Sequence, residues 1–121
     1  MRLLLPIFIL AVLMTGCKKS NNSGVDSQPP VVSLTSPMNL QSFPVGQIPI
    51  NAIITDNDTL ASLHLNIEGP DFIHYAYAGS GKTQNLTEDI PVSIKGKYTV
   101  TLEAFDKAGN HGEAKVEITV N

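Results

Sequence analysis

The sequence predicts an all-β sandwich of seven strands over residues 29–121. In this region apolar residues alternate with polar ones, which is the period of a strand with one buried face. The alternating runs are short, and Gly, Pro, Asn and Asp separate them. No window keeps a helical spacing, and five prolines between positions 37 and 91 further disfavour helices. These three observations define the fold class.

The seven predicted strands are defined by their inward-facing apolar residues. In chain order these are Val32 and Leu34; Ile48, Ile50, Ala52 and Ile54; Leu63, Leu65 and Ile67; Ile73, Tyr75 and Tyr77; Ile90, Val92 and Ile94; Tyr98, Val100, Leu102 and Ala104; and Val116, Ile118 and Val120. Because the chain has a single cysteine, no intramolecular disulfide can support such a domain. The alternating apolar faces must therefore supply nearly all of its stability.

Residues 1–16 are predicted to be a signal peptide. Met1-Arg2 gives a short positive start, and an almost wholly apolar run follows from Leu3 to Met14. A run of about 12 residues is shorter than the roughly 20 that a membrane-spanning helix needs. The segment therefore fits an export signal better than a membrane span.

The four residues Met14-Thr15-Gly16-Cys17 resemble the lipobox of bacterial lipoproteins. In that family the signal peptide is cut before the cysteine, which is diacylated on sulfur and then acylated on its amine. The resemblance implies that Cys17 is the lipidation site and that acyl chains hold the protein on the membrane, each buried CH₂ contributing about 0.8 kcal/mol. Because Lys18 rather than Asp follows the cysteine, the resemblance also implies the bacterial outer membrane. The alternative is an ordinary secretory peptide.

Residues 17–28 are predicted to be the lipidated cysteine followed by a flexible tether. The segment after the cysteine is polar, rich in Gly, Ser and Asn, and has no hydrophobic period. The folded domain then occupies residues 29–121.

Two segments of that domain resemble bacterial immunoglobulin-like modules. Residues 29–37 (PPVVSLTSP) are similar to the opening strand of such modules, and residues 96–110 (GKYTVTLEAFDKAGN) to their F strand and F–G turn. The resemblance covers residues 29–121 and implies a lipoprotein with one immunoglobulin-like domain, a group of unknown function. It also implies that Tyr98 forms a tyrosine corner, in which the hydroxyl bonds to the backbone a few residues upstream.

Strand direction predicts which loops lie near the tether. If the seven strands alternate down and up, the tether enters at the pole with the loops 56–59, 78–82 and 106–112. The opposite pole carries residues 36–46, 68–71 and 94–97.

The charge balance argues against nucleic acid as a partner. The net charge is −3, whereas phosphate binding needs a basic face. Residues 76–83 (AYAGSGKT) match a relaxed phosphate-loop pattern, but that motif needs a following helix, and the next residues show no helical period. We therefore expect no nucleotide either, and interpret Gly79-Ser80-Gly81 as a tight turn between strands.

A calcium site is one candidate at the tether pole. The oxygen-bearing side chains of Asp56, Asn57, Asp58, Asp106 and Asn110 fall in two loops of that pole. Calcium takes six to eight oxygen ligands, so converging carboxylates and amides are the chemistry it requires. The competing interpretation is that Asp and Asn are there to shape turns.

A zinc site is a second candidate, on the outer face of the third and fourth strands. His64 and His74 alternate outward on these two strands, which adjacent pairing would bring together. Two imidazoles plus a carboxylate such as Glu68 or Asp71 could hold zinc. Exposed histidines without a metal are the alternative.

The sequence offers no catalytic constellation, so we expect a protein that is not an enzyme. The leading hypothesis is a non-enzymatic, lipid-anchored module of the cell envelope that binds a protein or a glycan, with Phe43, Phe72 and His74 as candidate contacts, although a core position is the favoured interpretation of Phe43. The alternatives are a calcium- or zinc-binding module, and a structural accessory lipoprotein of an envelope complex. We expect a monomer without a cofactor other than the possible calcium.

Overall fold

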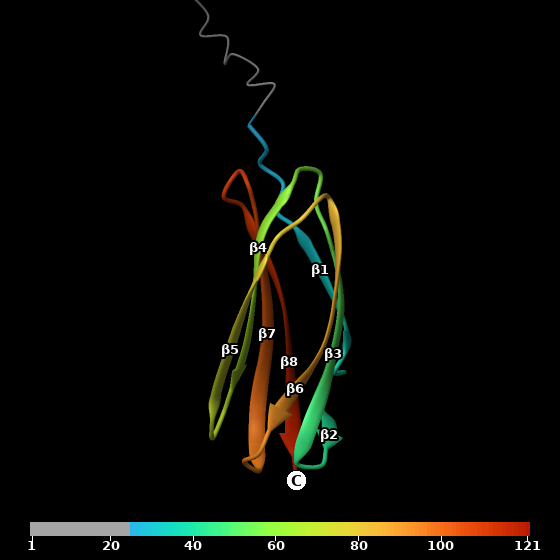
Figure 1. Cartoon of the computed structure of the whole chain (residues 1–121), viewed down its shortest axis with the longest axis vertical. Helices are drawn as coiled ribbons and strands as arrows, with labels where there is room; N and C mark the ends of the chain where they lie inside the picture. Colours follow the sequence, from blue (N-terminus) through green and yellow to red (C-terminus); the bar gives the residue numbers. More distant parts are fainter. Residues whose placement is uncertain (1–24) are drawn as a thin grey trace, which may run out of the picture.

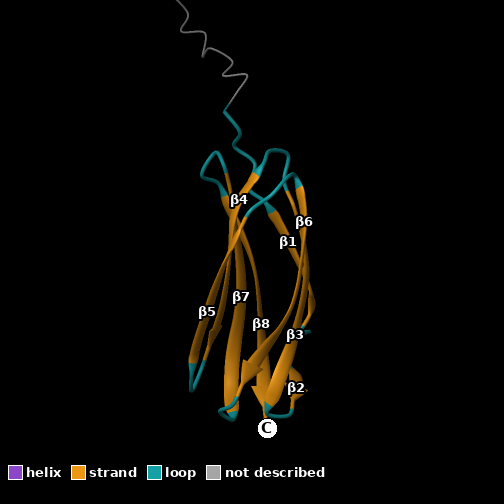
Figure 2. Ribbon diagram, viewed as in Figure 1, coloured by secondary structure: helices purple, strands orange, loops and turns teal. Residues whose placement is uncertain are grey.

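The computed structural model of the chain describes residues 25–121, so Cys17 and the predicted signal peptide lie outside the described part. The described residues form two facing β-sheets and no helix (Figures 1 and 2). The strands are β1 (Val31–Ser36), β2 (Gln41–Phe43), β3 (Gly46–Thr55), β4 (Leu60–Glu68), β5 (Phe72–Ala78), β6 (Thr83–Val92), β7 (Gly96–Asp106) and β8 (His111–Val120). Within residues 25–121 there is accordingly no helix long and apolar enough to cross a membrane.

The two sheets have the topology of an immunoglobulin-like sandwich, which confirms the predicted fold class. One sheet has three strands in the order β1-β3-β6, and the other has five in the order β2-β8-β7-β4-β5. All neighbouring strands are antiparallel except β2, which runs parallel to β8. The long ladder between β3 and β6 extends from the pair Gly46↔Val92 to the pair Thr55↔Thr83.

The core lies between the sheets and follows the predicted alternation. In β7 every second residue from Tyr98 to Asp106 is buried, and β3 and β4 show the same period of two. The fully buried side chains include Ile48, Ile50, Ile54, Leu63, Leu65, Ile67, Val100 and Leu102. Phe43 is buried in this core, as the favoured interpretation of this residue predicts, so it is not a contact residue.

The predicted tyrosine corner is present. Tyr98 is 2% exposed, and its hydroxyl donates a hydrogen bond of 2.6 Å to the carbonyl oxygen of Ile94. This bond ties the start of β7 to the connection that leads into it.

Two details of the strand prediction are wrong. The sandwich has eight strands rather than seven, because Gln41–Phe43 forms the extra strand β2 by parallel pairing with the far end of the chain. The fifth predicted strand also starts earlier, at Thr83, and ends at Val92, which leaves Ile94 exposed in the next connection. Both errors have the same cause: a three-residue strand and a mostly exposed edge strand show too little hydrophobic alternation to be recognised.

The predicted distribution of loops is confirmed. The chain enters the sandwich at the pole that carries the β3–β4, β5–β6 and β7–β8 connections (Figure 1). Backbone hydrogen bonds join these loops: the Asp56 N–H donates to the Lys82 carbonyl, and the Lys107 N–H donates to the Thr59 carbonyl. We call this end the tether pole.

Candidate cation site at the tether pole

Three carboxylates meet at the tether pole. Asp56 follows β3 and Asp106 is the last residue of β7, while Asp26 comes from the segment before β1. One carboxylate oxygen of each residue lies within 4.8 Å of those of the other two. Within residues 25–121 this is the only group of three or more His, Cys, Asp or Glu side chains whose ligand atoms come this close.

Asp106 is the most deeply buried of the three carboxylates. The residue continues the buried face of β7 and is 2% exposed. The β7–β8 turn folds Asn110 back onto it, so that the Asn110 backbone N–H donates to Asp106 Oδ1 at 2.9 Å and the Asn110 side-chain amide to Oδ2 at 3.0 Å. Gly109, with φ of 90°, supplies the left-handed backbone that this turn needs.

The other three residues predicted to bind calcium, Asn57, Asp58 and Asn110, donate hydrogen bonds to the carboxylates of the cluster. The Asp58 backbone N–H donates to Asp56 Oδ2 at 3.3 Å, and the Asn57 side-chain amide donates to Asp26 Oδ1 at 2.8 Å. Of the five predicted residues, Asp56 and Asp106 belong to the carboxylate cluster. Asn57, Asp58 and Asn110 shape the turns and hold the carboxylates in place, so part of the turn interpretation is also correct.

Asp26 is the site residue that sequence reasoning missed, because it falls inside the predicted tether. The Asn110 side-chain amide donates to the Asp26 carbonyl at 2.9 Å, and the Gln28 N–H donates to Asp26 Oδ1. Just downstream, the Pro30 carbonyl rests directly over Gly112, where any side chain would collide with it. The signal that could have found Asp26 was the predicted loop distribution, since it places the end of the tether beside the two acidic loops.

Within the described part of the chain, no positive charge acts on two carboxyls of the cluster, those of Asp56 and Asp106. Asp26 Oδ2 and Asp56 Oδ1 are shielded from solvent, and neither has a hydrogen-bond partner among the described residues. Burial is the main cause that raises the pKa of Asp56 above its ordinary 3.8, and the charges of Asp106 and Asp26 add to it. Burial also acts on Asp106, but hydrogen bonds, led by those from Asn110, outweigh it and lower the pKa of that carboxyl. The cluster therefore favours a bound cation, or a proton held on Asp56.

The predicted histidine pair also forms, on the outer face of the five-stranded sheet. The rings of His64 and His74 stack with centroids 5.6 Å apart, and His74 Nδ1 makes a hydrogen bond with Asn66 Oδ1. In the described part of the chain, no third His, Cys, Asp or Glu joins them within the distance that defines the aspartate cluster. The zinc hypothesis thus has two ligands and lacks the carboxylate it needs.

The two histidines belong to a row of rings that crosses four strands. From edge to interior the row consists of Phe72, His74, His64, Phe105 and His111, with successive centroids 5.5 to 6.5 Å apart. His111 joins the row because it pairs directly with Phe105 across β7 and β8. Most of these rings turn their faces or edges toward one another, which leaves less aromatic face free for a ligand.

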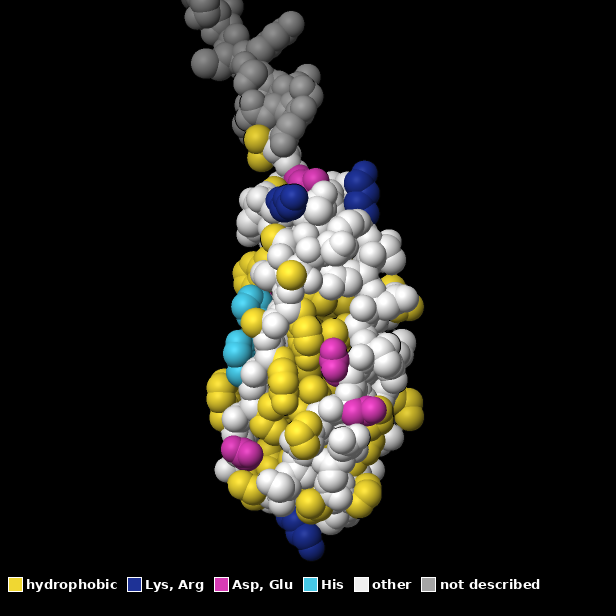
Figure 3. All heavy atoms as spheres, in the orientation of Figure 1, with side chains coloured by type: hydrophobic (Ala, Val, Ile, Leu, Met, Phe, Trp, Pro, Cys, Tyr) yellow, Lys and Arg dark blue, Asp and Glu magenta, His cyan; other side chains and the backbone are white. Residues whose placement is uncertain are grey.

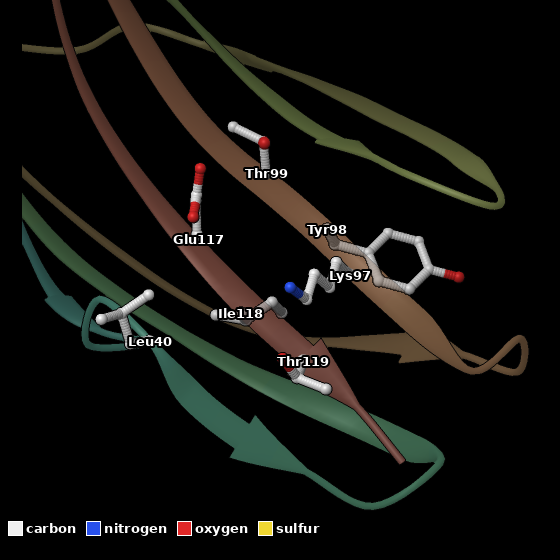
Figure 4. Close-up of a pocket in the computed structure, with 7 residues that line it drawn as sticks. All are labelled: Leu40, Lys97, Tyr98, Thr99, Glu117, Ile118 and Thr119. Carbon is white, nitrogen blue, oxygen red and sulfur yellow. The ribbon is translucent and has the colours of Figure 1, made fainter.

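A hollow of about 230 Å³ lies at the opposite end of the five-stranded sheet (Figure 4). It is bounded by Leu40, Lys97, Tyr98, Thr99, Glu117, Ile118 and Thr119. Leu40 has a left-handed backbone with φ of 65°, and its N–H donates to the Glu117 carbonyl at 2.6 Å. One lysine and one glutamate provide the charged groups of its lining, and no cluster of titratable groups converges there.

Comparison with solved structures supports the fold. OgpA from Akkermansia muciniphila matches with a TM-score of 0.59 and 15% identity over 78% of this chain and 30% of that protein. The endo-β-1,4-mannanase from Thermotoga petrophila matches with a TM-score of 0.57 and 16% identity over 83% of this chain and 21% of the enzyme. CopC from Methylosinus trichosporium OB3b matches with a TM-score of 0.50 and 21% identity over 75% of this chain and 94% of CopC.

These likenesses show a shared β-sandwich and no more, since all are below 25% identity. The chain spans only 30% of OgpA and 21% of the mannanase, so it resembles one module of each larger protein. No protein-family model matches the sequence, and no curated protein matches it either.

Proposed function

We propose that this chain is a non-enzymatic, lipid-anchored binding module of the bacterial cell envelope, and that it binds Ca²⁺ where the tether meets the sandwich. The immunoglobulin-like fold and the resemblance of residues 14–17 to a lipobox support the first part. One structural neighbour, the mannanase, has a name that indicates a glycan substrate. A module of this fold in such an enzyme is compatible with a protein- or glycan-binding role.

The observation that supports calcium is the cluster of Asp26, Asp56 and Asp106. Three carboxylates converge, and two of their oxygens are shielded from solvent and have no hydrogen-bond partner in residues 25–121. Among the described residues, the charged groups that act on Asp56 are the carboxylates of Asp106 and Asp26. A hard divalent cation with oxygen preference satisfies both the orphaned oxygens and the charge, and water can complete its six to eight ligands.

Calcium bound at this place would join two parts of the molecule. Asp56 and Asp106 belong to the sandwich, whereas Asp26 belongs to the segment that leads to the predicted anchor at Cys17. An ion shared by all three would fix the direction in which the module leaves its tether. We infer that the ion orients the module relative to the membrane, because the sequence predicts a polar, flexible tether between the anchor and the sandwich.

The test is a calcium titration of the chelator-treated full chain at pH 7.5, followed by calorimetry. We expect one ion per chain with a dissociation constant of about 0.1–1 mM, the range of extracellular calcium modules. Asp26→Asn should weaken binding at least tenfold without unfolding the sandwich, since residue 26 precedes the first strand. The matched control is Asp89→Asn, which removes one exposed carboxylate from β6 and should leave the affinity unchanged.

Two outcomes would contradict the calcium proposal. One is the absence of a heat of binding up to 10 mM Ca²⁺, a limit about tenfold above the weakest expected constant. The other is equal affinity in the Asp26→Asn and Asp89→Asn chains, because the tether carboxylate would then not be a ligand.

A further inference from the structure

β5 leaves one edge of the five-stranded sheet open. The strand pairs with β4 from Ser62↔Ala78 to Glu68↔Phe72, and it is the last strand of its sheet. No other described strand pairs with its second edge. A free edge presents a row of backbone donors and acceptors to which another strand can pair.

Two hydrogen bonds show which residues of β5 direct their backbone N–H and C=O groups toward the open edge. The Gly79 N–H donates to the Ala61 carbonyl at 2.8 Å, and the Gly69 N–H donates to the Asp71 carbonyl at 3.0 Å. In an antiparallel ladder, pairs of residues that hydrogen-bond to each other alternate with pairs whose backbone N–H and C=O groups point away from each other. Gly79 and Asp71 belong to the bonded pairs of the ladder between β4 and β5. The register between β4 and β5 has no shift, so the even-numbered residues of β5 direct their backbone groups to the open edge.

The ends of this open edge are already satisfied, whereas its middle is free. Asp71 Oδ1 accepts a hydrogen bond from the Phe72 N–H at 2.9 Å, and the Gln84 side-chain amide donates to the Ala78 carbonyl at 3.0 Å. Between them, the backbone groups of His74 and Ala76 point outward without a partner in residues 25–121. The stretch of β5 that can pair with another strand therefore lies between Phe72 and Ala78.

β5 lacks the features that usually protect an edge strand. Its sequence FIHYAYA contains no Asp, Glu, Lys, Arg or Pro, and Phe72 is 63% exposed. Of the other edge strands, β6 carries Glu88, Asp89 and Pro91, and β2 has only three residues. β1 (VVSLTS) also lacks charge and proline, but it is shorter than β5 and its pairing with β3 has a register shift between Leu34 and Ser36. Charge and proline are the common devices against edge-to-edge association, and β5 is the longest edge strand without them.

We propose that β5 is a homodimer interface, in which the β5 strands of two copies pair antiparallel about Tyr75. The outward groups of His74 then bond to those of Ala76 in the second copy, and the Phe72 carbonyl accepts from the second copy's Ala78 N–H. The second bond of this end pair, from the Phe72 N–H to the second copy's Ala78 carbonyl, is not formed, because Asp71 and Gln84 already occupy these two groups. This proposal differs from the monomer that the sequence alone led us to expect.

The side chains of β5 complement one another in this register. On the outer face each large ring meets a methyl group, since Phe72 lies opposite Ala78 and His74 opposite Ala76. On the inner face Tyr75 meets its own copy and Ile73 meets Tyr77, and no like charges oppose each other. Figure 3 shows hydrophobic side chains exposed along the open side between β5 and β6, next to this edge. The second copy would cover part of that strip.

The symmetry has a consequence for the anchored protein. Antiparallel pairing directs the two tether poles to opposite ends of the dimer. Both anchors can therefore reach one membrane only when the joined sheets lie along its surface.

Cysteine crosslinking tests the interface and its register together. In the full chain carrying Cys17→Ala in mild detergent, Tyr75→Cys provides the only thiol. The two copies of residue 75 should form a non-hydrogen-bonded pair with Cα atoms about 4.5 Å apart, which a disulfide can bridge. We expect most of this variant to become a disulfide dimer under mild oxidation, and at least fivefold less dimer for Ala76→Cys, which faces His74. Equal crosslinking of both variants would overturn the register.

A charge exchange tests the same interface without a covalent bond. Tyr75→Lys and Tyr75→Glu should each weaken dimerisation at least tenfold in sedimentation equilibrium, because like charges meet at the two-fold axis, and an equimolar mixture should restore it. Ile53→Lys, at a 46% exposed apolar position on the other sheet, is the matched control and should leave the dimer intact. Wild-type protein that stays monomeric at 0.5 mM, or a folded mixture that fails to associate, would refute the proposal.

Discussion

Replacement of Tyr98 by Phe removes one oxygen atom from the tyrosine corner and nothing else. The hydroxyl is buried with its ring and donates a 2.6 Å hydrogen bond to the Ile94 carbonyl. Such a bond contributes a net of about 0.5–1.5 kcal/mol, and its loss leaves a carbonyl that water must satisfy instead. Because Ile94 is itself exposed, water can reach that carbonyl, so we expect a loss of about 1–1.5 kcal/mol rather than more.

Urea unfolding followed by circular dichroism measures this loss. With an m-value of about 1 kcal/mol/M, the midpoint should fall by about 1–1.5 M while m stays the same. In a thermal experiment the same change lowers Tm by about 4–12 °C for a domain of this size.

Tyr77→Phe is the matched control, and it should not lower the stability of the protein. The Tyr77 hydroxyl is shielded from solvent and has no hydrogen-bond partner among the described residues. Burial, together with the charge of Glu88 and the neighbouring Tyr75, raises the pKa of this phenol. Its removal should leave stability unchanged or raise it by up to about 1 kcal/mol. Equal destabilisation by both substitutions would refute the assignment of Tyr98 as a hydrogen-bonded corner.

Three further predictions concern the tether pole and the anchor. The pKa of Asp56 is raised in the folded state, so its protonation stabilises the fold. This contribution is fully present below pH 3.8 and is lost as the pH rises through the raised pKa. Unfolding curves measured without calcium should show this loss, and Asp56→Asn should abolish it. Gly112→Ala should lower stability by about 1–3 kcal/mol in urea unfolding, because the added methyl group meets the Pro30 carbonyl, whereas Gly109→Ala meets no atom and changes only the strain at its φ of 90°. Cys17→Ala should eliminate incorporation of labelled fatty acid and release the protein from the membrane fraction, and continued labelling would contradict the anchor assignment.

The sequence predicts most of this fold because strands with one buried face carry a strong signal. β3, β4 and β7 alternate over nine to eleven residues, and the structure buries the side of each strand that the pattern indicates. The tyrosine corner at Tyr98 came from the resemblance of residues 96–110 to an immunoglobulin-like F strand and not from this alternation. β2 gave no signal, because its pairing partner is 77 positions away in sequence, as in Gln41↔Ile118.

The candidate site was predicted in part for a similar reason. Asp56 and Asp106 could be brought together by strand direction alone, since each ends a strand at the same pole. The loop distribution also places the end of the tether beside them, but it does not indicate that Asp26 turns inward, because that position depends on hydrogen bonds from Asn57 and Asn110 that no local pattern encodes. The open edge of β5 was equally invisible, since the order of strands in the sheets decides which strand lacks a neighbour.

Thermal unfolding of the full chain at pH 7.5, with chelator or with 2 mM Ca²⁺, tests the central claim most directly. With a dissociation constant of about 0.2 mM, calcium should stabilise the folded state by about 1.4 kcal/mol. That corresponds to a rise in Tm of about 5–10 °C, which Asp26→Asn should reduce to near zero and Asp89→Asn should leave intact. A Tm that calcium does not change in the wild-type chain would contradict the cation site at the tether pole.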